Sequence, residues 1–168
     1  MSDNLTIRIS KGTGTGRTTL AAFDAALVAA GVGDFNLIRL SSVVPPGSTI
    51  LKVEPQDGIS GDHGDALYCV YAEAHASLPG HEAWAGVAWS VRDDGSGAGL
   101  FVEHEGPSYE QVATDLGHSL EDLSASRGGV YHPQGRRITG ITCETLPVCA
   151  VVVATFRRAG WAEAADGH

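Results

Sequence analysis

Basic residues are scarce in this sequence. Its 168 residues include 11 lysines and arginines against 20 aspartates and glutamates, which gives a formal net charge of -9 at pH 7. A surface with this charge repels the phosphates of nucleic acids and of anionic lipids. We therefore expect no nucleic-acid partner and no membrane partner, and a small cationic molecule is the better electrostatic match.

Long apolar runs and paired cysteines are also missing. The run from Val148 to Phe156 is far too short to cross a bilayer, and residues 1–4 lack the basic and apolar regions of a secretory signal. Cys69, Cys143 and Cys149 are odd in number and form no CxxC pair, and the seven histidines show no HExxH spacing. We expect a reduced cytoplasmic protein with no disulfide framework and no metal site.

The composition and length favour one globular domain over residues 1–168, because 43% of the residues are hydrophobic and only 18% are charged. Helices are expected from Thr18 or Thr19 to about Ala30, and from Ser108, whose partner Gln111 completes a capping box. Alternation and turn signals predict strands over residues 5–10, 36–40, 66–76, 82–91, 98–104, 137–143 and 148–156. This count favours a packed α+β sandwich.

A glycine-rich segment, Lys11 to Thr18, precedes the first expected helix. A phosphate-binding loop needs a glycine where Lys11 stands and a lysine where Arg17 stands, so both diagnostic positions fail. The dinucleotide fingerprint fails too, because its third glycine would fall at residue 17. We interpret the segment as a flexible turn, and residues 11 and 17 argue against a nucleotide-binding function.

The residue spacing does not decide the roles of two carboxylates, Asp24 and Glu103. In the first expected helix, Leu20, Phe23 and Leu27 share one side, and Asp24 lies within or beside this apolar stripe. Glu103 lies on an expected strand, on the same face as Phe101. Each carboxylate is either an ordinary solvent-facing residue or a functional group that binds a cation or transfers a proton.

The segment Asn36 to Gly47 is the most distinctive stretch of the chain. An apolar strand reaches Ser41-Ser42 and then meets Pro45-Pro46, where the missing amide donors end the strand. A serine pair in this setting resembles a self-cleavage site at which one serine becomes a carbonyl cofactor.

The sequence as a whole resembles the pyruvoyl-dependent arginine decarboxylases. The resemblance covers most of the chain in the family's order, and its first block, which ends at the serine pair, is highly specific. It runs through residues 14–16, 20–27, 30–33, 36–42, 45–46, 78–80, 103–106 and 141–156.

The resemblance implies a zymogen that cleaves itself between Ser41 and Ser42, into fragments 1–41 and 42–168. Ser42 would become a covalent pyruvoyl group that forms a Schiff base with the substrate amine. Glu103 corresponds to the family's proton donor. Asp24 corresponds to the residue that receives the guanidinium of arginine, and a planar carboxylate matches that group with two parallel hydrogen bonds.

The resemblance further implies that Asn36 and Gly33 line the substrate site. It implies a four-layer αββα sandwich that assembles as a homotrimer or a pair of trimers. The expected function is the carboxy-lyase reaction from arginine to agmatine and carbon dioxide, for polyamine biosynthesis.

Two alternatives remain open at this point. The segments 61–65 and 131–133 are more polar than expected of the family, which leaves room for a decarboxylase that acts on a different amino acid. A family member that does not cleave, and serves as a trimeric binding or scaffold protein, is the other alternative.

Overall fold

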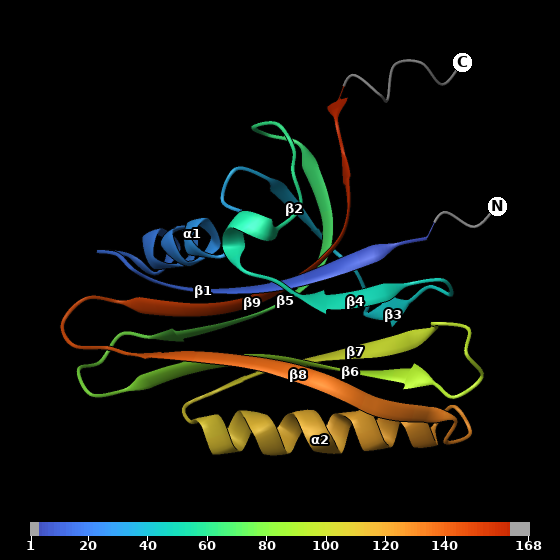
Figure 1. Ribbon diagram of the computed structural model, residues 1–168. Helices are drawn as coiled ribbons and strands as arrows, with labels where there is room; N and C mark the ends of the chain where they lie inside the picture. The colour runs from blue at the N-terminus through green and yellow to red at the C-terminus, as the bar shows by residue number, and fades with distance from the viewer. Residues whose placement is uncertain (1–3, 162–168) are drawn as a thin grey trace.

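The computed structural model describes residues 4–161 as two β-sheets with helices packed against them, a two-sheet α+β sandwich (Figure 1). The first sheet has the order β2 (Asn36–Arg39), β5 (Ala66–Ala76), β9 (Val148–Ala159), β1 (Thr6–Thr15) and β4 (Thr49–Lys52). The second has the order β3 (Val43–Val44), β7 (Gly99–Gly106), β6 (Glu82–Arg92) and β8 (Tyr131–Thr142). The helices are α1 (Thr19–Ala29), α2 (Tyr109–Ala125) and the short 3-10 turn η1 (Pro55–Asp57).

The main core lies between the two sheets. Strand β9 contributes side chains to this core and also to a second cluster, on the opposite face of its sheet, under α1. Val148, Ala150 and Val152 point into the inter-sheet core, whereas Cys149 and Val151 belong to the cluster under α1. Because successive side chains of a strand point to opposite faces, both faces of this central strand are buried. That explains why residues 148–156 read as a continuous apolar run.

The prediction of a flexible turn at the glycine-rich segment is wrong, because β1 continues through it as far as Thr15. Gly12 and Gly14 pair with Val151 and Cys149 of β9. A Cβ on Gly12 would lie 2.3 Å from the Ala26 carbonyl oxygen, and one on Gly14 would lie 2.4 Å from the Ala26 nitrogen. The glycines are therefore present because the backbone of α1 lies directly on β1.

The buried face of α1 differs from the predicted stripe. Thr18 caps the helix as expected, with its hydroxyl accepting a hydrogen bond from the Ala21 amide at 3.0 Å. The buried residues are Ala22, Ala26 and Leu27, whereas Leu20 is 75% exposed. Small alanines suit the close approach to the glycines of β1, whereas Leu20 and Val28 point outward.

The second helix agrees with its prediction. Ser108 caps α2 by accepting a hydrogen bond from the Gln111 amide at 3.2 Å. The predicted stripe is buried at Val112, Leu116 and Leu120, and Leu123 packs against the same cluster. These side chains cover the face of the second sheet that points away from the first.

Strand β8 begins earlier than the sequence suggests. The glycine, histidine and proline content of residues 127–134 predicts a loop, but the strand starts at Tyr131 and includes Pro133. β8 is an edge strand, and its pairing with β6 shifts register between Trp89 and Ser90. Proline is tolerated at such an edge, because the absent amide removes no ladder bond that a neighbour needs.

Each sheet leaves part of one edge open. β2 pairs with only the first four residues of β5, and β3 pairs with only Leu100 and Gly99 of β7. Residues 70–76 and 102–106 therefore have no strand partner on that side within the described part of the chain. No helix in residues 4–161 is both long and apolar enough to cross a bilayer.

Candidate functional site

The Ser41–Ser42 bond lies where the chain crosses from one sheet to the other. Just before it, the Leu40 amide donates to the Cys69 carbonyl of β5 at 2.9 Å. Just after it, the Ser42 carbonyl accepts from the Phe101 amide of β7 at 2.8 Å. The two residues that flank Ser41 are thus held by different sheets, so the bond between the serines is fixed from both sides.

Ser42 has an unusual backbone conformation. Its φ is 77°, and no other non-glycine residue among residues 4–161 has a positive φ. In this region the Cβ of an L-residue crowds the carbonyl oxygen, which costs about 1–2 kcal/mol. The predicted cleavage site is therefore a point of stored backbone strain, as expected where a normally unreactive amide must be activated.

The Ser42 hydroxyl donates a hydrogen bond to Glu103 Oε1 at 2.5 Å. Phe101 and Glu103 lie two residues apart on β7, so their side chains project from the same face of the strand. The bond from Phe101 to the Ser42 carbonyl sets the register that brings the hydroxyl to the carboxylate. We call these two residues the Ser42–Glu103 pair.

Glu103 also lines a cavity of about 240 Å³ between β5 and β7. The cavity walls include Arg39, Glu73 and Glu105, and three glutamates face one arginine. Such an acidic excess attracts a cationic ligand. This cavity lies beside the open stretches of the two sheet edges described above.

Arg39 is a site residue that the sequence reasoning missed. Its guanidinium lies 4.3 Å from the centre of the Tyr71 ring and donates to the Tyr71 carbonyl at 2.6 Å. Its position two residues before Ser41, at the end of a strand, is a signal that could have identified it. Arg39 supplies the positive charge in the acidic cavity.

Burial controls the titration of two groups near Arg39. It raises the pKa of the Cys69 thiol to about 12, despite the opposing effect of the Arg39 charge. Burial also raises the pKa of Tyr71. Both groups are therefore neutral at pH 7, and Cys69 is not a thiolate nucleophile that competes with Ser42.

The predicted substrate residues lie apart from the Ser42–Glu103 pair in the described chain. Asp24 is exposed on α1, and its side chain has no hydrogen-bond or ion-pair partner within residues 4–161. Asn36 donates through Nδ2 to the Gly64 carbonyl at 2.8 Å. Gly33 packs on Val28, where an added Cβ would lie 2.5 Å from Cγ2. No hydrogen bond joins these three residues to Ser42 or Glu103 among the described residues.

The polar segment 61–65 has a structural explanation. Asp65 is buried, accepts a hydrogen bond from the Asp62 amide at 2.8 Å, and pairs with Arg158 at 3.3 Å. Asp65 therefore closes the turn and ties it to β9. The polarity of this segment is used inside the fold, which weakens it as a sign of a different substrate.

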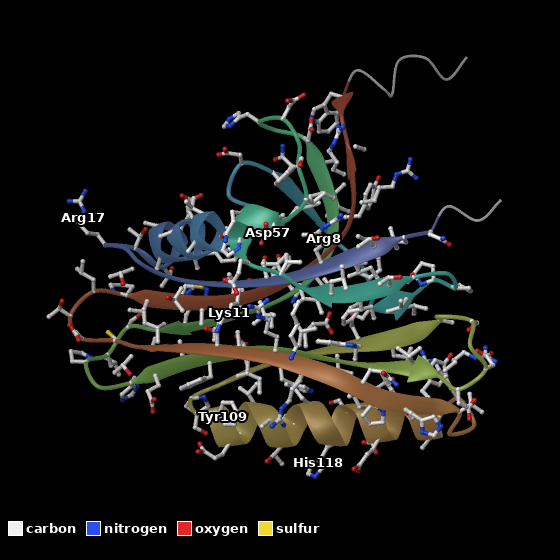
Figure 2. The ribbon with its side chains drawn as sticks, viewed as in Figure 1. Arg8, Lys11, Arg17, Asp57, Tyr109 and His118 are labelled. Atoms are coloured by element: carbon white, nitrogen blue, oxygen red, sulfur yellow. The ribbon has the colours of Figure 1, made fainter. Side chains whose placement is uncertain are left out.

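Arg17, one of the cations of the glycine-rich segment, does not line the acidic cavity. Arg17 is exposed and extends away from the end of β1, instead of folding over the glycine backbone (Figure 2).

Comparison with known proteins gives a consistent result. A protein named pyruvoyl-dependent arginine decarboxylase from Halobacterium salinarum is 43% identical over 97 residues, which is 58% of each chain. The relative of that name from Methanocaldococcus jannaschii is 34% identical over 108 residues, 64% of this chain and 62% of the relative. Pyruvoyl-dependent arginine decarboxylase 2 from Archaeoglobus fulgidus is 30% identical over 118 residues, 70% of this chain and 74% of the relative.

The matching segment thus spans less than two thirds of the Halobacterium relative. The family itself is matched more broadly, over residues 6–156, a range that contains α1, the serine pair and Glu103. This chain belongs to the pyruvoyl-dependent arginine decarboxylase family.

Proposed function

We propose that this protein is a pyruvoyl-dependent decarboxylase that converts arginine to agmatine and carbon dioxide. The observation that carries the proposal is the contact between the Ser42 hydroxyl and Glu103, at the one strained non-glycine residue of the described chain. Membership of the family supports the same activity.

The first step is self-cleavage within the single domain 1–168. Ser42 Oγ attacks the Ser41 carbonyl carbon while Glu103 accepts the hydroxyl proton, and the Ser41–Ser42 amide becomes an ester with a free Ser42 amine. β-Elimination then breaks the Cβ–Oγ bond and releases Ser41 as the carboxylate end of fragment 1–41. Hydrolysis of the remaining enamine, with loss of ammonia, gives residue 42 of fragment 42–168 a ketone.

The residues present fit a pyruvoyl group at position 42. Its ketone would arise beside the acidic cavity, and Phe101 would hold the adjacent carbonyl through its amide. The group supplies a carbonyl that binds the substrate amine and accepts the electrons left by carbon dioxide. Glu103 then holds a proton on its carboxyl group and delivers it to the substrate α-carbon.

Asp24 is the proposed ligand of the substrate guanidinium. It has no partner within the described chain, so its carboxylate is available for a bidentate pair with an external cation. Asn36 and Gly33 are proposed to line the same site. The acidic cavity favours arginine, or another cationic amino acid, over an anionic one.

The proposed assembly is a homotrimer, or a pair of trimers, with sites between subunits. Three observations support it. The two sheet edges beside Glu103 are open, Leu20 and Val28 are 75% and 60% exposed on the face of α1 that carries Asp24, and Asp24 does not contact the Ser42–Glu103 pair. A second subunit would cover the edges and bring its own Asp24 to the cavity.

The wider architecture and the location complete the proposal. The packing of α1 on β1 and β9, and of α2 on β6, β7 and β8, supports a four-layer αββα sandwich (Figure 1). The three cysteines are free thiols, which supports a reducing compartment such as the cytoplasm.

The test is release of carbon dioxide from a panel of carboxyl-labelled amino acids, including arginine, lysine, ornithine and aspartate, with Ser42→Ala as the control. We expect release from arginine and none from the control. A cleaved protein that acts on another member of the panel would change the substrate assignment. A chain that is never cleaved and never releases carbon dioxide would support a scaffold role instead.

A further inference from the structure

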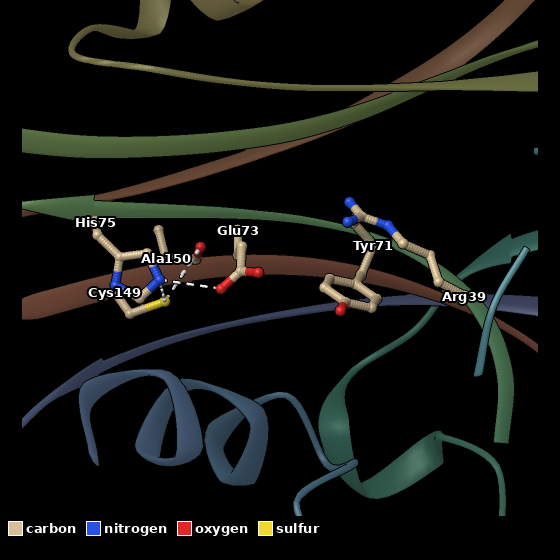
Figure 3. Close-up of polar contacts among 6 residues, drawn as sticks. All are labelled: Arg39, Tyr71, Glu73, His75, Cys149 and Ala150. Carbon is tan, nitrogen blue, oxygen red and sulfur yellow. Dashed lines mark hydrogen bonds and ion pairs between the residues drawn. The ribbon is translucent and has the colours of Figure 1, made fainter. Parts of the chain in front are cut away.

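Three potential metal ligands converge on the face of the first sheet that α1 covers. Glu73 and His75 lie two residues apart on β5, and His75 pairs directly with Cys149 of β9. Their side chains therefore project from the same face of the sheet. Figure 3 shows the Glu73 carboxylate and the Cys149 sulfur both directed at the His75 ring.

The distances describe one compact cluster. His75 Nε2 lies 3.0 Å from Glu73 Oε2 and 3.9 Å from Cys149 Sγ, and the ligand atoms of all three residues lie within 4.8 Å of one another. Two ligands of a tetrahedral zinc ion lie about 3.3–3.7 Å apart, given bonds of about 2.0–2.3 Å. The observed separations bracket this range, so small side-chain adjustments would suffice.

The geometry is unsuited to a nucleophilic triad. In such a triad the carboxylate orients the histidine through one ring nitrogen, and the nucleophile contacts the other. Here the carboxylate and the thiol both face the same nitrogen, Nε2. One ring nitrogen carries at most one proton, so it cannot donate to both partners, whereas a cation can bind all three groups at once.

The electrostatic surroundings also suit a cation. Cys149 is fully buried, and the Glu73 carboxylate lies in the same cluster. A bound metal ion holds a coordinating thiol as thiolate. Access is available because the side chains of Glu73 and His75 are 33% and 31% exposed.

We propose that Glu73, His75 and Cys149 bind one divalent metal ion of the zinc class, with a fourth position open to water. The donor set of one thiolate, one imidazole and one carboxylate is typical of zinc and of its cobalt substitute. The sequence alone predicts no metal site, because Cys149 is 74 residues from His75 and no short motif joins the three ligands.

The site lies next to the helix that carries Asp24. The Phe23 ring packs on the His75 ring with centroids 6.3 Å apart, and Phe23 directly precedes Asp24. A metal that fixes the His75 ring would therefore stabilise this contact between α1 and β5. Binding to the folded chain alone should raise Tm.

The experiment uses the full-length protein, purified without a metal-affinity tag, stripped with a chelator and titrated with Co²⁺. We expect one cobalt ion per chain, a thiolate-to-cobalt charge-transfer band, and displacement of cobalt by Zn²⁺. Because loss of an outer-shell partner alone costs about 10–100-fold in affinity, loss of the Cys149 ligand should weaken Zn²⁺ binding at least about 100-fold.

Cys149→Ser and His75→Gln should abolish the charge-transfer band, and Cys143→Ser should keep it. Cys143 is also a buried cysteine, so it is a matched control for loss of a core thiol. His75→Gln alters a partly exposed side chain and keeps the test valid if Cys149→Ser does not fold. A wild-type protein that binds no cobalt, or a band that survives His75→Gln, would overturn the proposal.

Discussion

The close contact between α1 and β1 makes Gly14→Ala a sharp test of how the fold positions the substrate residue. A Cβ at this position would lie 2.4 Å from the Ala26 nitrogen, 2.6 Å from the Ala25 Cβ and 2.7 Å from the Ala22 carbonyl oxygen. Ordinary contacts begin at 3.4 Å, so α1 must retreat by about 1 Å. The obstacle includes helix backbone, which cannot turn aside as a flexible side chain can.

The expected magnitude follows from this displacement. Inserting a methyl group into a packed core costs about 1–3 kcal/mol, and a backbone obstacle places Gly14→Ala near the upper end, about 3 kcal/mol. For a chain of this length that lowers Tm by roughly 6–12 °C. Since α1 carries Asp24, a misplacement of about 1 Å should also lower kcat/KM for arginine by about 100-fold.

Thermal unfolding followed by circular dichroism measures the first effect, and steady-state carbon dioxide release measures the second. Gly117→Ala is the matched control. Gly117 lies exposed in α2, and an added Cβ there would meet nothing within 4 Å. Alanine is the better helix former by up to about 1 kcal/mol, so this variant should keep or raise Tm and leave kcat/KM unchanged. A Gly14→Ala protein with the Tm of the wild type would refute the packing argument.

The remaining predictions concern side chains. Glu103→Gln keeps an oxygen acceptor that orients the Ser42 hydroxyl but cannot take its proton, so cleavage should be slower. In the cleaved fraction, decarboxylation should fall by about 10²–10⁴-fold, and a normal rate of carbon dioxide release from that fraction would disqualify Glu103 as the proton donor. Asp24→Asn should mainly raise KM for arginine, and unchanged arginine kinetics would remove Asp24 from the substrate site. The folded-state pKa of Cys69 is raised from 9.0 to about 12, so the folded chain binds the proton more tightly and the free energy of unfolding should fall as pH rises through this window. Denaturant unfolding across that range should show a smaller fall for Cys69→Ala, and equal slopes would contradict the burial argument.

The sequence was a good guide where one local signal acted alone. The capping box at Ser108 and the stripe Val112–Leu116–Leu120 predicted α2 and its buried face. The alternation of residues 66–76 predicted β5 with the bounds that the structure has. In these elements the tertiary contacts reinforce the local preference.

The sequence misled where a distant contact decided the structure. Gly12 and Gly14 predict a turn locally, yet both lie in strand β1. They are glycines because a side chain at either position would collide with the backbone of α1. The same contact selects alanines for the buried face of α1, which no apolar periodicity could indicate. β3 and β4 are too short to show an apolar alternation in the sequence. They form because they pair with β7 and β1, which lie far along the chain.

In the candidate site, too, the sequence predicted the residues that have a local signal and missed those that distant contacts bring together. The serine pair and its family resemblance predicted that Ser42 and Glu103 act together, and the structure brings them into contact. Arg39 and the Glu73–His75–Cys149 cluster were missed, because their neighbours come from strands that only the sheet order brings together. In the proposed trimer, Asp24, Asn36 and Gly33 would join the site through contacts between subunits, and a single sequence contains no pattern for those.

We infer that the chain cuts itself between Ser41 and Ser42 to form its own cofactor. Intact-mass measurement of the purified wild-type protein and of Ser42→Ala tests it most directly. We predict two wild-type fragments, residues 1–41 and 42–168, with a carbonyl that reacts with hydrazine at the start of the second, and one uncut chain for Ser42→Ala. A wild-type chain of full-length mass, or cleavage that persists in Ser42→Ala, would rule out a pyruvoyl group formed from Ser42.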